Sequence, residues 1–139
     1  MLSTIKVEKF SMMDINEEYL SMLNGGDNRY SRHDKIVWTK EKAEVYIRSR
    51  QEEGSFLFKY TDESNSLLGT TCAMRESSKD VNLGIMVNSD KRRQGIGLYI
   101  WRVALNELRK EKIETVTAGT LLKNKAMIKI LKNTMNFDC

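Results

Sequence analysis

Two glycines and three cationic side chains stand together in the run Lys91-Arg92-Arg93-Gln94-Gly95-Ile96-Gly97. Glycine lets a backbone approach a ligand closely, while Arg and Lys supply forked donors and point charges suited to phosphate. A strand-like apolar segment at residues 81–87 precedes this run, and an amphipathic segment at 98–111 follows it. The first N–H groups of a helix have no internal partner and its dipole favours anions, so the arrangement predicts a pyrophosphate-binding turn.

Other interpretations of this basic turn are open. A basic triplet beside glycine is often only a solvated loop, and it could also contact nucleic acid. Nucleic-acid binding is disfavoured because no aromatic residues interleave the basic run and 19 acidic residues are mixed with the basic ones. The P-loop and dinucleotide-binding motifs do not fit, since neither Gly-Lys-Ser/Thr nor a third glycine follows at the required spacing.

The composition is that of an ordinary globular protein. The chain has 139 residues, 40% hydrophobic and 30% charged, with a formal net charge of +4, and we expect one domain over residues 1–139. The two cysteines are far apart, which favours a reduced, cytoplasmic compartment. No apolar run approaches membrane-spanning length, so no membrane association is expected. One histidine and two distant cysteines do not predict a metal site.

Hydrophobic periodicity predicts a mixed α/β domain. Apolar runs predict strands at residues 5–10, 55–61, 67–75, 81–87 and 115–121. Helices are expected at 16–23, from the N-cap Thr39 to a stop at Gly54, at 98–111, and from Asn124 onward. The third helix should bury a stripe of Leu98, Trp101, Leu105 and Leu108. This order places the basic turn between a strand and a crossover helix, with the next strand parallel to the first.

The glycine turn within this order of elements resembles the GNAT superfamily of acyl-CoA-dependent N-acyltransferases. The family motif Gln/Arg-x-x-Gly-x-Gly/Ala is matched by residues 92–97, and Asn124 matches an Asn that opens the last helix. The resemblance implies a twisted, mostly antiparallel mixed sheet with helices on both faces. It also implies a central parallel pair of strands splayed around coenzyme A. The family usually continues into two more strands, so we expect these to be missing here.

The resemblance also implies the residues that hold acetyl-CoA, the cosubstrate. The turn amides would bind the pyrophosphate, and the preceding strand would bind the pantetheine arm. The expected cofactor-binding residues are Ile85, Met86, Val87, Arg92, Arg93, Gln94, Gly95, Ile96, Gly97 and Asn124. A strand N–H at residues 85–87 is the expected donor to the developing oxyanion.

Catalytic and acceptor residues are less defined by the sequence. Many family members carry a late Tyr that protonates the leaving thiolate, but no Tyr follows Tyr99 here. Glu76 and His33 are the candidate bases, with ordinary solvated side chains as the alternative. The loop residues Arg29, Tyr30 and Arg32 are expected to contact the acceptor, because forked donors suit phosphates or carboxylates.

We therefore expect transfer of an acetyl group from acetyl-CoA to a primary amine of a small acceptor by direct attack. A nucleotide-linked amino sugar is the favoured acceptor. The alternatives are a protein N-terminus of the ribosomal-protein type and a degenerate domain that binds coenzyme A without catalysis. An exposed sheet edge near the C-terminus is a pairing hazard, so a homodimer through this edge is expected. Neither nucleic acid nor membrane is an expected partner.

Overall fold

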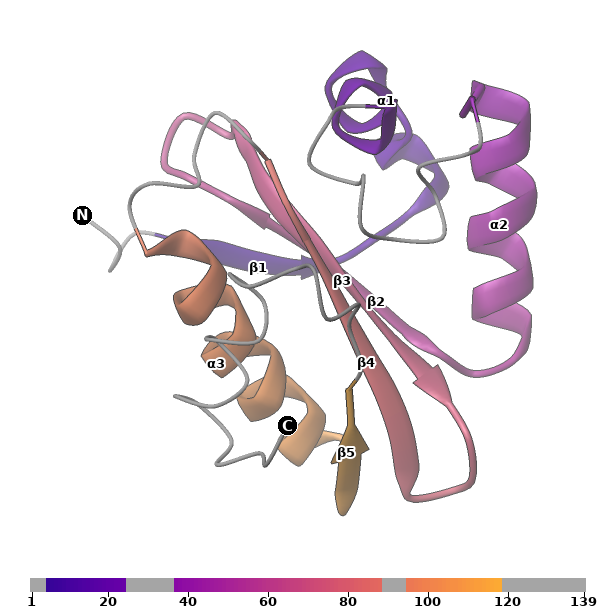
Figure 1. The fold of residues 1–139 in the computed structure, drawn as a ribbon, viewed down its shortest axis with the longest axis vertical. Helices are drawn as coiled ribbons and strands as arrows, with labels where there is room; N and C mark the ends of the chain where they lie inside the picture. The colour runs from indigo at the N-terminus through magenta and orange to yellow at the C-terminus, as the bar shows by residue number, and fades with distance from the viewer. Residues whose placement is uncertain (1–4, 25–36, 89–94, 119–139) are drawn as a thin grey trace.

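The computed structural model describes residues 5–24, 37–88 and 95–118, and they form one sheet with helices packed against it (Figure 1). The elements in chain order are β1 (Lys6–Lys9), the 3₁₀ helix η2 (Met12–Asp14), α1 (Glu17–Asn24), α2 (Lys40–Glu52), β2 (Phe56–Thr61), β3 (Leu67–Arg75), β4 (Asp80–Val87), α3 (Ile96–Lys110) and β5 (Thr115–Thr117). Within these ranges, no helix is long and apolar enough to cross a membrane.

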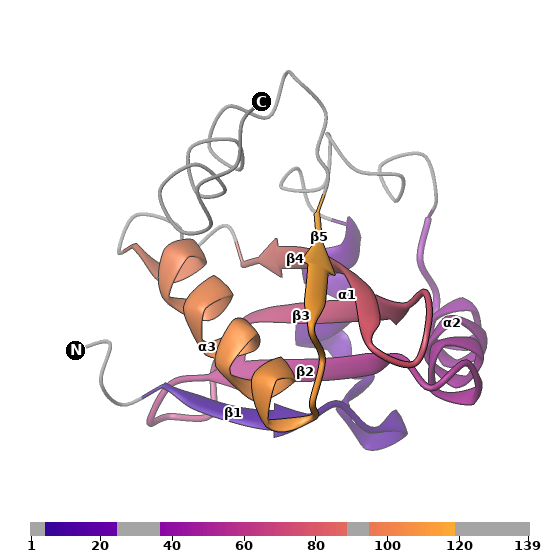
Figure 2. The same cartoon turned by 90° about the horizontal axis from the view of Figure 1, so that it is seen from below.

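The five strands lie in the order β1-β2-β3-β4-β5. The first four pair antiparallel in succession, and Figure 2 shows them stacked with β1 at the far edge. β5 reaches β4 after the crossover through α3 and pairs with it in parallel. The predicted fold class is confirmed, including the parallel pair on either side of the crossover helix.

Helices cover both faces of the sheet, with α3 on one side and α1 and α2 on the other (Figure 1). Alternate strand residues point to opposite faces, so each face has its own core. In β2, for example, Phe58 and Tyr60 pack in the α3 core, while Leu57 packs in the α1–α2 core. We use these two names below for the two buried clusters.

Helix α2 begins and ends where the sequence predicts. Its N-cap is Thr39, whose side chain accepts a hydrogen bond from the Lys42 N–H at 3.2 Å. Gly54 follows the helix with a φ of 79°, a left-handed conformation that glycine adopts without strain. Local chemistry therefore determines both ends of this helix.

Helix α3 begins earlier than predicted. The expected start at Leu98 is wrong, because the helix runs from Ile96 and takes Gly97 into its first turn. The expected stripe is also displaced. Trp101 and Leu108 are buried as predicted, but Leu98 and Leu105 are half-buried at the margins of the face. The centre of the face is made by Ile96, Gly97, Ile100, Trp101, Ala104 and Leu108.

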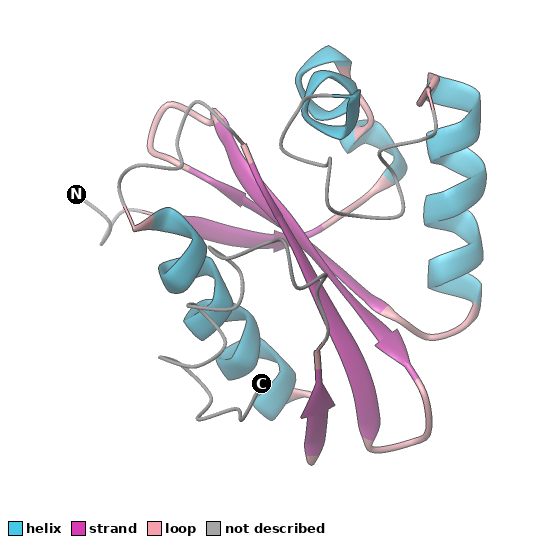
Figure 3. Ribbon diagram, viewed as in Figure 1, coloured by secondary structure: helices cyan, strands magenta, loops and turns pink. Residues whose placement is uncertain are grey.

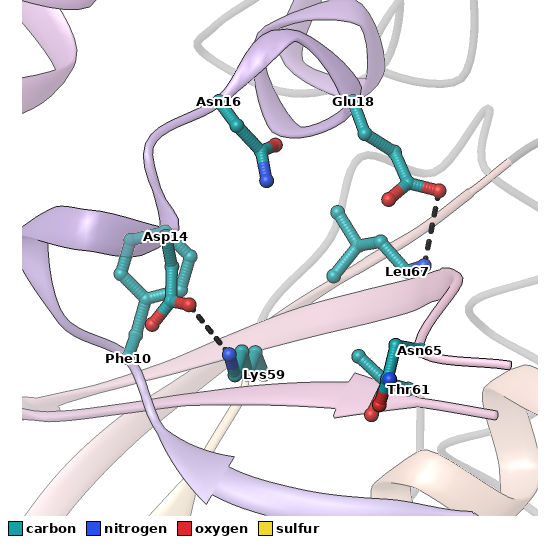
Figure 4. A pocket seen from close by; sticks show the side chains of 8 residues that line it. All are labelled: Phe10, Asp14, Asn16, Glu18, Lys59, Thr61, Asn65 and Leu67. Carbon is teal, nitrogen blue, oxygen red and sulfur yellow. Dashed lines mark hydrogen bonds and ion pairs between the residues drawn. The ribbon is translucent and has the colours of Figure 1, made fainter. Parts of the chain in front are cut away.

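An ion pair joins η2 to the sheet beside a small pocket of about 60 Å³ (Figure 4). Lys59 of β2 pairs with the Asp14 carboxylate, which also accepts a hydrogen bond from the Ser11 N–H at 2.8 Å. The pocket is lined by Phe10, Asp14, Asn16, Glu18, Lys59, Thr61, Asn65 and Leu67. None of these residues belongs to β4, α3 or β5, so this pocket is separate from the site described below.

The Asp14 carboxylate is expected to contribute stability that is lost in acid. Burial raises the pKa of Asp14, but hydrogen bonds from Lys59 and Ser11 outweigh it, and the net pKa lies below its ordinary 3.8. A lowered folded-state pKa gives stability that is complete above 3.8 and is lost as pH falls through the folded value. Asp14→Asn should therefore lower the unfolding free energy at neutral pH and flatten its decline in acid.

Urea unfolding of the wild type and Asp14→Asn, at neutral pH and well below pH 3.8, measures this difference. Glu8→Gln is the control, because Glu8 is an exposed carboxylate on β1. A wild-type pH profile that coincides with that of Asp14→Asn would show that the ion pair contributes nothing.

Candidate active site

The backbone of β4 presents alternate residues to its two neighbours. Beyond its end, the Asn88 N–H donates to the Leu68 carbonyl of β3 at 2.8 Å. Along an antiparallel ladder, N–H and C=O groups alternate between the two sides of the strand. Since Asn88 faces β3, the even-numbered residues of β4 do so as well. The N–H and C=O groups of Leu83, Ile85 and Val87 therefore point to the opposite side, where β5 lies.

β5 covers only the beginning of that side. Figure 3 shows that β5 runs beside only one end of β4. The parallel register matches Asp80 with Thr115 and ends at Asn82 with Thr117. In a parallel ladder the pair Asn82–Thr117 is joined through the flanking odd-numbered residues of β4, so the Leu83 N–H is directed to β5. In the part of the chain that the structure describes, no strand is paired on this side with residues 84–87. These residues form what we call the open edge, a row of backbone donors and acceptors directed into the space beyond β5.

The start of α3 supplies a second set of backbone donors. Its first internal hydrogen bond runs from the Tyr99 N–H to the Gly95 carbonyl at 3.2 Å, so the N–H groups of Ile96, Gly97 and Leu98 precede the helical ladder. Gly95 is the N-cap, has a φ of 69° and offers no side-chain cap. We call residues 95–97 the phosphate cradle, because the helix dipole and free amides favour an anion here.

The cradle also has room in front of it. Among the residues that the structure describes, a Cβ placed on Gly95 would meet no atom within 4 Å, so none of them blocks the approach of a group to the Gly95 backbone. The first turns of α3 pack directly on the end of β4, since Val87, Ile96 and Ile100 belong to the same buried cluster. The open edge and the phosphate cradle therefore lie next to each other on one side of the sheet.

The predicted cofactor-binding residues in the described ranges divide into two groups. Ile85 and Val87 present their backbone at the open edge, and Gly95, Ile96 and Gly97 form the cradle. Met86 differs, because its backbone faces β3 and its side chain packs against the α1–α2 core. The structure does not bring Met86 to the open edge. Leu83, which lies in the strand expected to bind the pantetheine arm, has the same backbone direction as Ile85, but its N–H is directed to β5.

The candidate base Glu76 lies near the other end of β4. Its Oε1 accepts a hydrogen bond from the Thr117 hydroxyl at 3.3 Å. That hydroxyl in turn accepts one from Nδ2 of Asn82 at 3.1 Å. We call these three residues the polar chain. The polar chain lies where the pairing of β4 with β5 ends. The sequence did not predict a role for Thr117, because there it is only one β-branched residue of a short strand.

The other predicted site residues lie outside the described residues. They are Arg29, Tyr30, Arg32, His33, Arg92, Arg93, Gln94 and Asn124.

Comparison with known proteins identifies the family. The model of the acetyltransferase (GNAT) family matches residues 12–137. The chain therefore belongs to the GNAT family of acetyltransferases, and the predicted enzyme class, an N-acetyltransferase, is confirmed. No curated protein matches the chain by sequence.

Solved structures share the fold at low sequence identity. Spermidine N-acetyltransferase from Vibrio cholerae, in complex with CoA and spermine, is 11% identical, with a TM-score of 0.82 over 96% of this chain and 80% of that one. Ribosomal-protein-alanine N-acetyltransferase from Brucella melitensis is 17% identical, with a TM-score of 0.78 over 94% and 83%. A phosphinothricin acetyltransferase from Sinorhizobium meliloti, in complex with AcCoA, is 15% identical, with a TM-score of 0.73 over 94% and 73%.

Proposed function

We propose that the protein binds acetyl-CoA along the open edge and the phosphate cradle, and transfers the acetyl group to a primary amine of a small acceptor. The observation that carries this proposal is the continuity of two kinds of backbone donor. Among the described residues, the N–H groups of Ile85 and Val87 line a strand edge that no strand pairs with, and this edge leads to the first amides of α3. An extended amide-containing arm that ends in a pyrophosphate is complementary to both.

Each part of the site has a role in this reaction. The amides of Ile96 and Gly97 hold the pyrophosphate, helped by the side chains of Arg92, Arg93 and Gln94. The backbone of the open edge pairs with the amide groups of the pantetheine arm. A remaining N–H of the edge stabilises the negative charge that develops on the thioester oxygen. Fixing both reactants in contact removes much of the entropic cost of attack.

The favoured acceptor is a nucleotide-linked amino sugar. The support for this choice is the sequence Arg29 to Arg32, whose guanidinium groups suit phosphate or carboxylate. A protein N-terminus is the second candidate, supported by the fold shared with the ribosomal-protein-alanine enzyme. Spermidine is a third candidate acceptor, supported by the fold shared with the Vibrio enzyme. Glu76 and His33 remain the proposed bases.

Two measurements test this function. Calorimetry with coenzyme A measures cofactor binding, and millimolar or weaker affinity would contradict the binding site. Release of the coenzyme A thiol from acetyl-CoA is then followed with UDP-linked glucosamine, an alanine-initial peptide and spermidine. Turnover with the sugar nucleotide above the other two supports the favoured acceptor. Binding without turnover on any amine would instead support a non-catalytic coenzyme A-binding domain.

Gly95→Ala is expected to weaken coenzyme A binding by about tenfold or more. The new Cβ projects into the space in front of the cradle and would cost at least one hydrogen bond to a charged group, worth about 1.5–3 kcal/mol. The left-handed φ of 69° adds a stability cost of roughly 1–2 kcal/mol. Calorimetry and thermal unfolding measure the two effects separately.

Gly54→Ala is the matched control for this backbone strain. Gly54 also has a left-handed φ, 79°, but it ends α2 on the other face of the sheet. Both variants should lose stability, and only Gly95→Ala should lose coenzyme A affinity. Equal coenzyme A affinities of the two variants would show that Gly95 does not contribute to coenzyme A binding.

We also propose that the protein works in the cytoplasm as a homodimer. The support is the position of β5 as the last strand of the described sheet, because an unpaired strand edge invites pairing with a second copy. Light scattering on the purified protein tests the oligomeric state, and a monomer at all concentrations would contradict it.

A further inference from the structure

The polar chain joins two segments that are distant in the sequence, one with Glu76 and Asn82 and the other with Thr117. Thr117 and Asn82 are 35 positions apart, and Thr117 and Glu76 are 41 apart. Asn82 has the same strand parity as Met86, whose side chain packs against the α1–α2 core, so the chain lies on that face of the sheet. The side chains of Glu76 and Thr117 are exposed, which leaves the chain open to an approaching molecule and to solvent.

The reach of the cofactor arm places the chemistry beside this chain. The pantetheine arm, from its phosphate oxygen to sulfur, has about as many backbone bonds as four extended residues, roughly 13–14 Å. From Val87, next to the cradle, four residues back along β4 lead to Leu83, about 13 Å at ~3.3 Å per residue. Leu83 directly follows Asn82, the last residue of β4 that pairs with β5. An arm laid along the open edge therefore ends beside the polar chain.

The hydroxyl oxygen of Thr117 can accept one more hydrogen bond than the structure gives it. Its hydroxyl hydrogen has two acceptors within reach, Oε1 of Glu76 at 3.3 Å and the Val81 carbonyl at 3.4 Å. One oxygen lone pair accepts from Nδ2 of Asn82 at 3.1 Å. A hydroxyl has one donor and two acceptor positions, so the second lone pair is available to an amine.

We propose that Thr117 relays a proton from the attacking amine to Glu76, and that Asn82 holds the Thr117 hydroxyl in position. This relay rests on the function proposed above. Thr117 touches the acceptor and is the catalytic residue. Glu76 acts through it as the proton acceptor, and Asn82 is a positioning residue. The relay assigns the base function to Glu76, at the point where the two strands part.

The atoms and charges balance in this step. The neutral amine nitrogen bonds to the carbonyl carbon, and its N–H becomes acidic as the bond forms. That proton moves to Oγ1 of Thr117 while the hydroxyl proton moves to Oε1 of Glu76. The C–S bond breaks with its electron pair on sulfur, and the thiolate takes a proton from solvent. Glu76 returns its proton to solvent, which leaves the acetylated amine and the free thiol.

Four variants test the relay, using whichever of UDP-linked glucosamine, the alanine-initial peptide and spermidine turns over fastest. Thr117→Val keeps the branched shape and removes the hydroxyl, so kcat should fall about 100-fold. Thr117→Ser restores the hydroxyl and should recover most of the rate. Glu76→Gln should also lose about 100-fold. Because the two residues act in series, the double variant should be no slower than the slower single variant.

Coenzyme A affinity, measured by calorimetry, should be unchanged in all four variants because none of them alters the cradle. Wild-type kcat in Thr117→Val, or losses that multiply in the double variant, would overturn the relay while leaving the proposed function intact. Absence of both binding and turnover in the wild type would overturn the proposed function and the relay with it.

Discussion

Gly69→Ala is expected to destabilise the protein by about 1–3 kcal/mol and to weaken coenzyme A binding as well. A Cβ on Gly69 would lie 2.5 Å from the Met86 carbonyl oxygen and 3.3 Å from Cα of Val87, both backbone atoms of β4. It would also lie 3.0 Å from Cδ1 of Ile100 in α3. Neither strand can yield locally, so the added methyl group should push the end of β4 and the start of α3 away from β3.

Gly84→Ala is the matched control for this close approach. Gly84 lies in β4 itself, but among the described residues its added Cβ would meet only the Cys72 carbonyl oxygen, at 3.9 Å. This substitution should change stability by less than about 1 kcal/mol, in the stabilising direction, because alanine has less freedom to lose on folding. Urea unfolding and calorimetry of both variants provide the comparison. Equal stability of the two variants would show that the sheet absorbs the clash.

Trp101→Ala is expected to cost about 3–5 kcal/mol of unfolding free energy. Trp101 is 0% exposed and belongs to the α3 core together with Phe58, Leu83 and Val87. The surrounding side chains come from several strands and cannot all move inward, so a cavity should remain. A loss of this size is a large part of the stability of a domain of this length.

Arg102→Ala provides the control on the same helix. Arg102 is exposed, and truncating a surface residue usually changes stability by no more than about 0.5 kcal/mol. Denaturant unfolding should separate the two variants clearly. A similar small effect in both would mean that α3 contributes little to the folded state.

Local sequence chemistry predicted most of the fold. The ends of α2 follow from a capping side chain at Thr39 and a left-handed glycine at 54, and each needs only its own neighbours. The strands followed from runs of apolar residues, and β3 matches its predicted bounds of 67–75. The start of α3 was misjudged because Gly97 was assigned to the turn. In the first helical turn its N–H needs no internal partner, so glycine there does not prevent the helix.

The missed features depend on contacts between distant segments. The polar chain exists because the register of β4 and β5 places Asn82 opposite Thr117, and no local pattern around either residue indicates this register. The importance of Gly69 also depends on distant segments, because its lack of a side chain matters only where β4 and α3 meet β3. Met86 was assigned to the cofactor because the family resemblance gives the strand before the turn to the pantetheine arm, whereas strand parity turns the Met86 backbone toward β3.

The unequal pairing of β4 should appear as an alternating pattern of hydrogen–deuterium exchange. Even-numbered amides are bonded to β3 and exchange only when the β3–β4 hairpin opens. The amides of Ile85 and Val87 face the open edge, so in the ligand-free protein they should exchange much faster than their immediate neighbours. A molecule that pairs with this edge would slow every second amide of one strand. The periodicity of that footprint would reveal how the ligand lies, even before its chemical identity is known.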